Sequence, residues 1–198
     1  MTKAEFLNKY YPLAVRACKG TGIFPQTLIT QLIGESGYNL SSLATKYNNF
    51  FGIKSGSAWK GKVVSMTTKE YRADGTPYTV KGTGKMYASR AIALQDGAAS
   101  ASLFRVYSSI EDGFKGYIAF LQANSRYKDV FKAQSPEQQF AELKKAGYAT
   151  QPNYVQYLTS IYNGIRSTLA NIPVGAVATG GLLLFTAIAY AAYQMARK

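Results

Sequence analysis

The chain has 198 residues, of which 47% are hydrophobic and 14% aromatic, so it can bury a core and is not disordered. It contains no histidine, which excludes Ser-His-Asp and Cys-His catalysis, and its one cysteine, Cys18, can form neither an internal disulfide nor a metal cluster. Lysine and arginine outnumber aspartate and glutamate by 23 to 10, and the resulting net charge of +13 predicts attraction to a polyanion.

Two helices are predicted at the start of the chain. Residues 2–19 are amphipathic, and Pro12 is the expected position of a kink. A second helix begins near Pro25 and runs to about Glu35, where Gly37 ends it. Both are followed by glycine, the residue that most readily ends a helix.

The middle of the chain predicts a small sheet. Residues 59–71 are rich in β-branched and aromatic types and are predicted as one strand, with a turn at Asp74-Gly75 and a partner strand at 78–80. The Gly/Ser/Ala-rich stretch 81–102 is predicted as a loop or insertion. The remaining predicted elements are a short strand at 104–107 and helices at about 109–123, 136–146 and 152–170. The sequence therefore predicts an α+β fold, mainly α, with a small β-hairpin lobe.

The C-terminal segment has no charge from residue 167 to residue 196. Its apolar run, Val174 to Met195, is long enough at 1.5 Å per residue to cross a hydrocarbon core of about 30 Å. Arg197 and Lys198 follow at once. The predicted organisation is therefore a globular domain at residues 1–166 and a transmembrane anchor with a short basic tail at 167–198, the membrane span being 174–195.

The basic residues are spread along the chain and form no helix-turn-helix, zinc or RNP-type signature. Nucleic acid is therefore not expected as a partner, which leaves anionic lipid and the anionic bacterial cell wall. Acid–base chemistry must come from carboxylates, tyrosines or lysines. No metal or organic cofactor is expected.

Glu35 is the strongest candidate for catalysis. It lies at the end of an apolar helix, where Leu32, Ile33 and Phe51 are expected to keep water away and to raise its pKa. A raised pKa is what a general acid needs to protonate a glycosidic oxygen near neutral pH. The alternative is a surface glutamate, although a negative charge near a helix C-terminus opposes the helix dipole.

Four blocks of the sequence resemble glycoside hydrolase family 73, the endo-β-N-acetylglucosaminidases that include flagellar peptidoglycan hydrolases and bacterial autolysins. Together they span about residues 5–165 and occur in the family's order. The blocks are GESG at 34–37, NNFFGIK at 48–54, TTKEY at 67–71 with FRVYSS at 104–109 and residues 112–121, and GYATQPNY at 147–154.

The resemblance implies a lysozyme-like α lobe and a small β lobe with a groove between them. It implies that Glu35 is the proton donor and that Glu70, on the β lobe, is the second carboxylate. Glu70 would act as base for a water molecule or stabilise the charged transition state. Asp74 is its nearest competitor, and the alternative for Glu70 is a solvated charge on a strand.

Four further residues match the family near the groove. Tyr148 and Tyr154 would hold a sugar or assist the acid. Asn49 and Phe51 would shape the groove floor, with Asn49 as a candidate hydrogen-bond partner for an N-acetyl group. The sequence departs from the family at 81–101 and lacks the usual wall-binding repeats.

The function implied by the resemblance is cleavage of the β-1,4 glycan strands of peptidoglycan by an N-acetylglucosaminidase. A lytic transglycosylase or muramidase on the same fold is one alternative, since these enzymes need only one carboxylate. A non-catalytic, membrane-anchored wall-binding or virion assembly protein is another.

The start of the chain, MTKAEFLNKYY, carries charges and no apolar run, so a signal peptide is not expected. This suggests a phage lysis protein or a virion enzyme, with a secretion-system effector as the alternative. The expected location is a viral membrane or the bacterial inner membrane, with the catalytic domain facing the cell wall.

Overall fold

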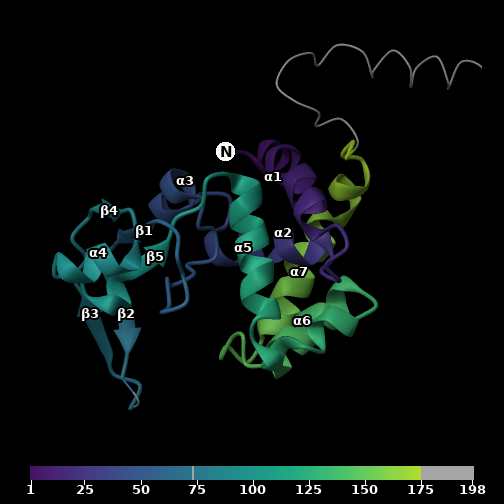
Figure 1. The fold of residues 1–198 in the computed structure, drawn as a ribbon. Helices are drawn as coiled ribbons and strands as arrows, with labels where there is room; N and C mark the ends of the chain where they lie inside the picture. The colour runs from purple at the N-terminus through teal and green to yellow at the C-terminus, as the bar shows by residue number, and fades with distance from the viewer. Residues whose placement is uncertain (73, 175–198) are drawn as a thin grey trace, which may run out of the picture.

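The protein folds into two lobes of unequal size, as a computed structural model of residues 1–72 and 74–174 shows (Figure 1). The larger lobe is helical, and the smaller one carries all the strands. The helices of the larger lobe are α1 (Lys3–Cys18), α2 (Pro25–Ser36), α5 (Ile110–Gln122), α6 (Pro136–Lys145) and α7 (Tyr154–Ala170). A short helix, α3 (Ser42–Tyr47), lies where the chain passes from the helical lobe toward the strands.

The predicted helices begin and end where their local sequence dictates. Thr2 and Glu5 form a capping box at the start of α1, because each side chain accepts a hydrogen bond from the other residue's backbone N–H. Pro25 occupies the first turn of α2, where its missing N–H costs nothing. Gly37 ends α2 with a φ of 59°, a conformation that suits glycine, and its N–H bonds to the Ile33 carbonyl at 2.7 Å.

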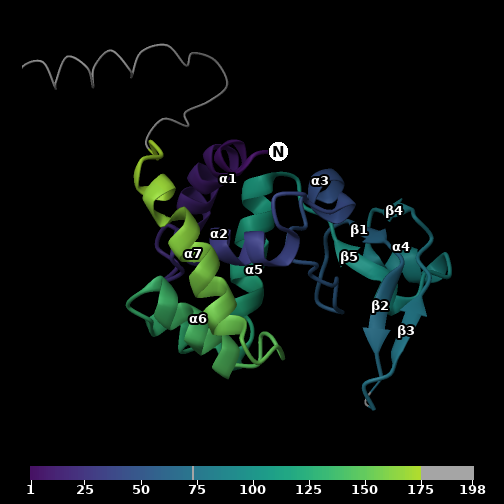
Figure 2. The ribbon, with the colours of Figure 1, turned by 180° about the vertical axis from the view of Figure 1, so that it is seen from behind.

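α2 is the central helix of the larger lobe and contacts α1, α6 and α7 (Figure 2). Seven successive residues, from Thr27 to Ile33, are buried, so the helix is covered on all sides rather than on one stripe. Gly34 lets α7 approach closely, because a Cβ at this position would lie 3.0 Å from a methyl carbon of Leu158. The end of α2, which carries Glu35, is thereby fixed against the lobe.

The β lobe contains two small sheets, both antiparallel. One has the strand order β4-β1-β5 and the other is the β2-β3 hairpin, in which Glu70 pairs with Tyr78. The strands are β1 (Val63–Ser65), β2 (Thr68–Tyr71), β3 (Pro77–Val80), β4 (Met86–Tyr87) and β5 (Leu103–Arg105). The core of this lobe is a cluster of five buried residues with Trp59 packed against it: Val63, Tyr87, Ala93, Ala98 and Leu103.

The single strand predicted at 59–71 was wrong. The chain makes two strands there, β1 and β2, which belong to different sheets. All three residues of β1 are buried, whereas β2 alternates between half-buried and exposed residues. The two segments therefore have different surroundings, which the shared β-forming composition could not reveal.

The loop predicted at 81–102 was also wrong. This stretch forms β4, then α4 (Arg90–Gln95) and the 3-10 turn η1 (Ser100–Ser102). Ser89 caps α4 by accepting a hydrogen bond from the Ile92 N–H, and Tyr87 donates a 2.8 Å hydrogen bond to Asp96 beyond it. Two of the small residues that suggested a loop, Ala93 and Ala98, are instead buried in the core of the β lobe.

The predicted fold class included a transmembrane helix, and this part of the prediction was wrong. Over residues 1–72 and 74–174, no helix is both long enough and apolar enough to cross a membrane. Asn171 is the C-cap of α7, the last helix of the described residues. The predicted span 174–195 lies, apart from Val174, outside the described residues. The fold is thus mixed α and β, mainly α, and the division at residue 166 stays a prediction.

Candidate active site

Glu35 lies in the last turn of α2, at the surface of the helical lobe. Its side chain is open to solvent on one side, yet the surrounding protein atoms raise its pKa by desolvation. Among the described residues no hydrogen bond or ion pair holds its carboxyl group. A carboxyl group that is accessible, unpaired and harder than usual to ionise can donate a proton.

Two of the predicted tyrosines lie close enough to Glu35 to feel its charge. The pKa values of Tyr148 and Tyr154 are both raised, first by burial and further by the negative charge of Glu35. Both phenols therefore stay protonated and act only as neutral hydrogen-bonding groups. The structure brings Glu35, Tyr148 and Tyr154 together, although both tyrosines are more than 110 residues from Glu35 in the chain.

Gln31 is a further residue of this cluster that the sequence analysis missed. Its side chain is buried one turn before Glu35, and its amide oxygen accepts a 2.7 Å hydrogen bond from the Tyr117 hydroxyl. Its amide nitrogen donates to the Tyr154 hydroxyl at 3.0 Å. Gln31 thus joins α2, α5 and α7 beneath the acid. The available signal was a glutamine four residues before Glu35 on an otherwise apolar helix.

Glu70 lies on β2 and forms an ion pair with Lys54, whose Nζ is 2.6 Å from Glu70 Oε1. Thr68 donates to the same oxygen at 3.2 Å. These contacts, above all the hydrogen bond from Lys54, lower the pKa of Glu70. Lys54 is itself held, because it also donates to the Ala101 carbonyl and lies 3.9 Å from the centre of the Phe104 ring. Glu70 is therefore fixed in its ionised form.

Asp74, the competitor of Glu70, lies in the turn of the hairpin. It accepts hydrogen bonds from the Thr76 backbone and hydroxyl at 2.9 and 2.6 Å. These bonds lower its pKa and are those of an Asx-type turn. Asp74 thus shapes the turn, while Glu70 is tied through Lys54 to the body of the protein.

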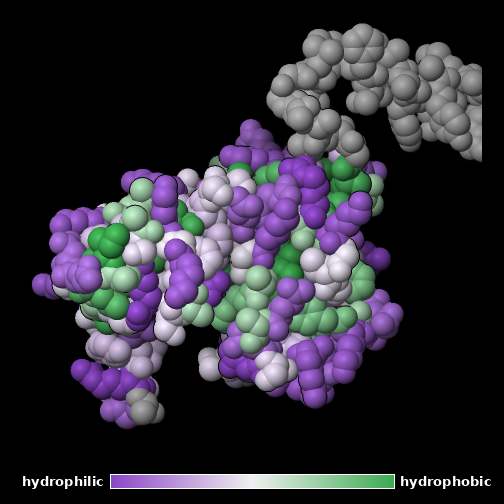
Figure 3. Space-filling model, in the orientation of Figure 1, coloured by the Kyte–Doolittle hydropathy of each residue, from purple (hydrophilic) through white to green (hydrophobic). Residues whose placement is uncertain are grey.

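The two carboxyl groups stand on different lobes. Figure 3 shows the surface notched between the β2-β3 hairpin and the helical lobe. Glu35 belongs to the helical side and Glu70 to the hairpin side.

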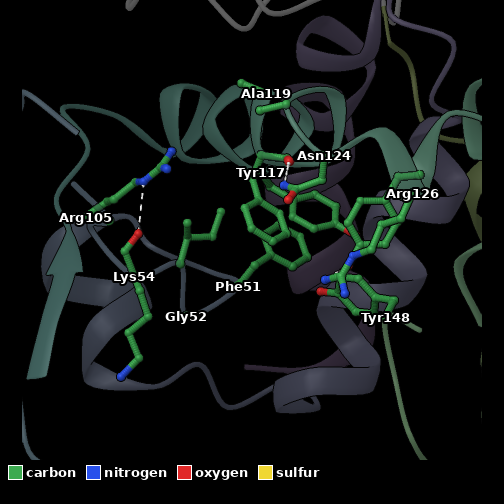
Figure 4. A pocket seen from close by; sticks show the side chains of 14 residues that line it. Phe51, Gly52, Lys54, Arg105, Tyr117, Ala119, Asn124, Arg126 and Tyr148 are labelled. Atoms are coloured by element: carbon green, nitrogen blue, oxygen red, sulfur yellow. Dashed lines mark hydrogen bonds between the residues drawn. The ribbon is translucent and has the colours of Figure 1, made fainter. Parts of the chain in front are cut away.

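A pocket of about 530 Å³ lies against both lobes (Figure 4). Phe51 and Tyr117 stack in it with ring centres 3.9 Å apart and planes 17° apart. Tyr148 lines it on the side of Glu35, and Lys54 lines it on the side of Glu70. Glu35 and Glu70 do not line the pocket themselves. The pocket lies next to them, because residues that do line it, Tyr148 and Lys54, are close to Glu35 and Glu70 respectively.

The family model described as mannosyl-glycoprotein endo-beta-N-acetylglucosaminidase matches residues 11–167 of the chain. The chain belongs to this glucosaminidase family. The resemblance to glycoside hydrolase family 73 is thereby confirmed.

The relatives of this glucosaminidase domain include cell-wall enzymes. Peptidoglycan hydrolase FlgJ of Pseudomonas aeruginosa is 32% identical over 176 residues, which cover 86% of this chain and 39% of that protein. Exo-glucosaminidase LytG of Bacillus subtilis is 26% identical over 163 residues, covering 78% and 51%. A solved C-terminally truncated glycoside hydrolase domain of Salmonella typhimurium FlgJ has a TM-score of 0.61 at 31% identity, covering 84% of this chain and 99% of that one. The chain spans 39% and 51% of the length of these two curated relatives.

One residue predicted for the glucosaminidase groove is placed inside the protein instead. Asn49 is 1% exposed, and its amide nitrogen donates to the carbonyls of Ile53 and Arg105 at 2.9 Å each. Its amide oxygen accepts from the Ile53 N–H. Because its amide nitrogen and oxygen both form hydrogen bonds within the protein, Asn49 ties the 49–53 loop to β5. Phe51, two residues later, does line the pocket.

Proposed function

We propose that the domain hydrolyses the β-1,4 glycan strands of peptidoglycan as an endo-β-N-acetylglucosaminidase, with Glu35 as general acid and Glu70 as second carboxylate. The observation that carries this proposal is the contrast between the two groups. Desolvation raises the pKa of Glu35, and Lys54 lowers that of Glu70. When two carboxyl groups have environments that shift their pKa values in opposite directions, the group with the raised pKa can act as the acid and the group with the lowered pKa as the base. Membership of the glucosaminidase family supports the same assignment.

In the proposed reaction Glu35 gives its proton to the glycosidic oxygen as the bond from that oxygen to the anomeric carbon breaks. The electron pair goes to the oxygen of the leaving sugar, and positive charge develops on the ring. Ionised Glu70 stabilises that charge or takes a proton from the water that attacks the anomeric carbon. Lys54 and Thr68 both bind Oε1 of Glu70, which leaves Oε2 for this task.

A lytic transglycosylase or muramidase remains the second candidate for the bond that is cut. Those reactions need Glu35 but not Glu70. The fixed, ionised state of Glu70 beside the pocket favours hydrolysis with two carboxylates. The net charge of +13 supports an anionic wall as the partner. The site of action then lies on the wall-facing side of a membrane, and the role in phage lysis or wall penetration stays a prediction.

The test is mass spectrometry of purified peptidoglycan digested with the full chain, beside the Glu35→Gln and Glu70→Gln variants. We expect fragments with reducing N-acetylglucosamine ends, which both variants lose. Reducing muramic ends or anhydromuramic ends would assign the muramidase or transglycosylase reaction instead. Binding of the wall by folded protein without any cleavage would support the non-catalytic alternative.

A further inference from the structure

The pocket beside the two carboxyl groups is cationic. Lys54, Arg105 and Arg126 line it, and none of its 14 lining residues is acidic. Lys54 is neutralised by Glu70. Among the described residues neither Arg105 nor Arg126 forms an ion pair, although the chain contains six other such pairs within the described part. The positive charges of Arg105 and Arg126 are therefore not neutralised by an ion pair and remain available in the pocket.

Both guanidinium groups are held in place by aromatic rings. The Arg105 guanidinium lies 4.8 Å from the centre of the Trp59 ring, and that of Arg126 lies 4.6 Å from the centre of the Tyr127 ring. Arg105 donates from Nε to the Lys54 carbonyl, and Arg126 donates from Nη2 to the Tyr127 hydroxyl. Among the described residues no carboxylate accepts a hydrogen bond from either fork, and the Tyr107 hydroxyl is a further neutral group close to Arg105. A guanidinium fixed in this way loses little entropy when it binds a carboxylate.

The two arginines come from different lobes and stand on opposite sides of the stacked Phe51 and Tyr117 (Figure 4). Arg105 ends β5 in the β lobe, and Arg126 follows α5 in the helical lobe. Aromatic faces suit the C–H face of a sugar or an apolar side chain, and the guanidinium forks suit carboxylates. The pocket thus combines an apolar floor with two anion-binding edges, at a volume typical of ligand sites.

We propose that this pocket binds a carboxylate carried by the muramyl residue of the glycan strand, namely a carboxylate of its peptide stem. The inference rests on the proposed function, because it places the strand between Glu35 and Glu70. A strand in the groove has muramyl residues on either side of the cleaved bond, and their acidic substituents project from the sugar chain. Arg105 and Arg126 would then select strands that carry peptides, a specificity separate from bond cleavage.

The experiment compares kcat/KM of the full chain on three substrates. The first is peptide-bearing strands, the second is strands whose peptide an amidase has removed, which exposes the lactyl carboxylate, and the third is such peptide-free strands with that carboxylate methyl-esterified. Arg105→Gln and Arg126→Gln are each expected to lower the preference for peptide-bearing over esterified strands by about tenfold, the loss of one charge-assisted hydrogen bond. Arg166→Gln is the matched control, since Arg166 also lies over a tyrosine ring but on α7 and outside the pocket.

The outcomes separate the sources of the carboxylate. A loss confined to peptide-bearing strands assigns the peptide stem. A loss confined to amidase-treated strands assigns the lactyl carboxylate instead and overturns the proposal, because that carboxylate is bound in an amide wherever the peptide is present. Equal effects of the variants on all three substrates would overturn the proposal. Arg126 is exposed, so its variant keeps the test valid even if Arg105→Gln disturbs β5. Failure of the unaltered protein to cleave any strand would contradict the proposed function rather than the pocket.

Discussion

The helical lobe and the β lobe differ in how their candidate carboxyl groups are kept in place. The helical lobe has a large core rich in aromatic side chains, and it carries Glu35 on a buried helix where desolvation raises its pKa. The β lobe has a smaller core, built around a cluster of five buried residues, and it holds Glu70 by an ion pair that lowers its pKa. In the helical lobe, the apolar surroundings destabilise the charged form of a carboxyl group. In the small β lobe, a positively charged side chain stabilises the charged form instead.

The largest expected effect is on catalysis by Glu35→Gln. Loss of the general acid should lower kcat by about 10² to 10⁴-fold.

The same substitution should not lower the free energy of unfolding. Because the folded pKa of Glu35 is raised, its ionisation destabilises the fold increasingly as pH rises above the ordinary value of 4.5. Urea unfolding at neutral pH should therefore show the variant to be no less stable than the natural protein, and clear destabilisation would contradict the desolvated environment.

The second prediction compares the two cores. Phe114→Ala removes a fully buried ring that packs on Phe50 in the helical lobe and should cost about 3–5 kcal/mol. Leu103→Ala, in the β lobe, should cost about 2 kcal/mol, the low end for such changes, because a small cluster collapses more easily around the space left. Denaturant unfolding measures both, and an equal cost would remove the distinction between the lobes.

The third prediction concerns the pH dependence of activity. Lys54→Met removes the hydrogen bond and charge that lower the pKa of Glu70, so that pKa should rise. Glu70 must be ionised in the proposed reaction, and the acidic limb of the kcat profile should therefore move to higher pH. Lys69→Met, one residue away on the same strand and free of ion pairs among the described residues, serves as the control. An unmoved acidic limb would exclude Glu70 as the ionised carboxylate.

The smallest expected effect tests how the end of α2 is fixed. The Tyr157 hydroxyl donates to the Gly34 carbonyl at 3.1 Å, beside Glu35. Tyr157→Phe should cost about 0.5–1 kcal/mol of stability, since the freed carbonyl near the surface can bind water. Tyr162→Phe, on the same helix and without a hydroxyl hydrogen bond among the described residues, should be near neutral. Thermal unfolding of both variants decides whether this contact supports the last turn of α2.

The sequence by itself determined the longer helices, the family and the candidate acid. Helix periodicity and caps are local, so Thr2, Pro25 and Gly37 sufficed to place α1 and α2, and Glu35 followed from its apolar neighbours. Only the tertiary structure decided the rest. Pairing of strands and burial of small residues depend on distant segments, which is why residues 59–71 divide between two sheets and 81–102 are ordered. The same holds for Gln31, Asn49 and the two pocket arginines, because hydrogen bonds and charges between segments far apart in the chain leave no periodic pattern in the sequence.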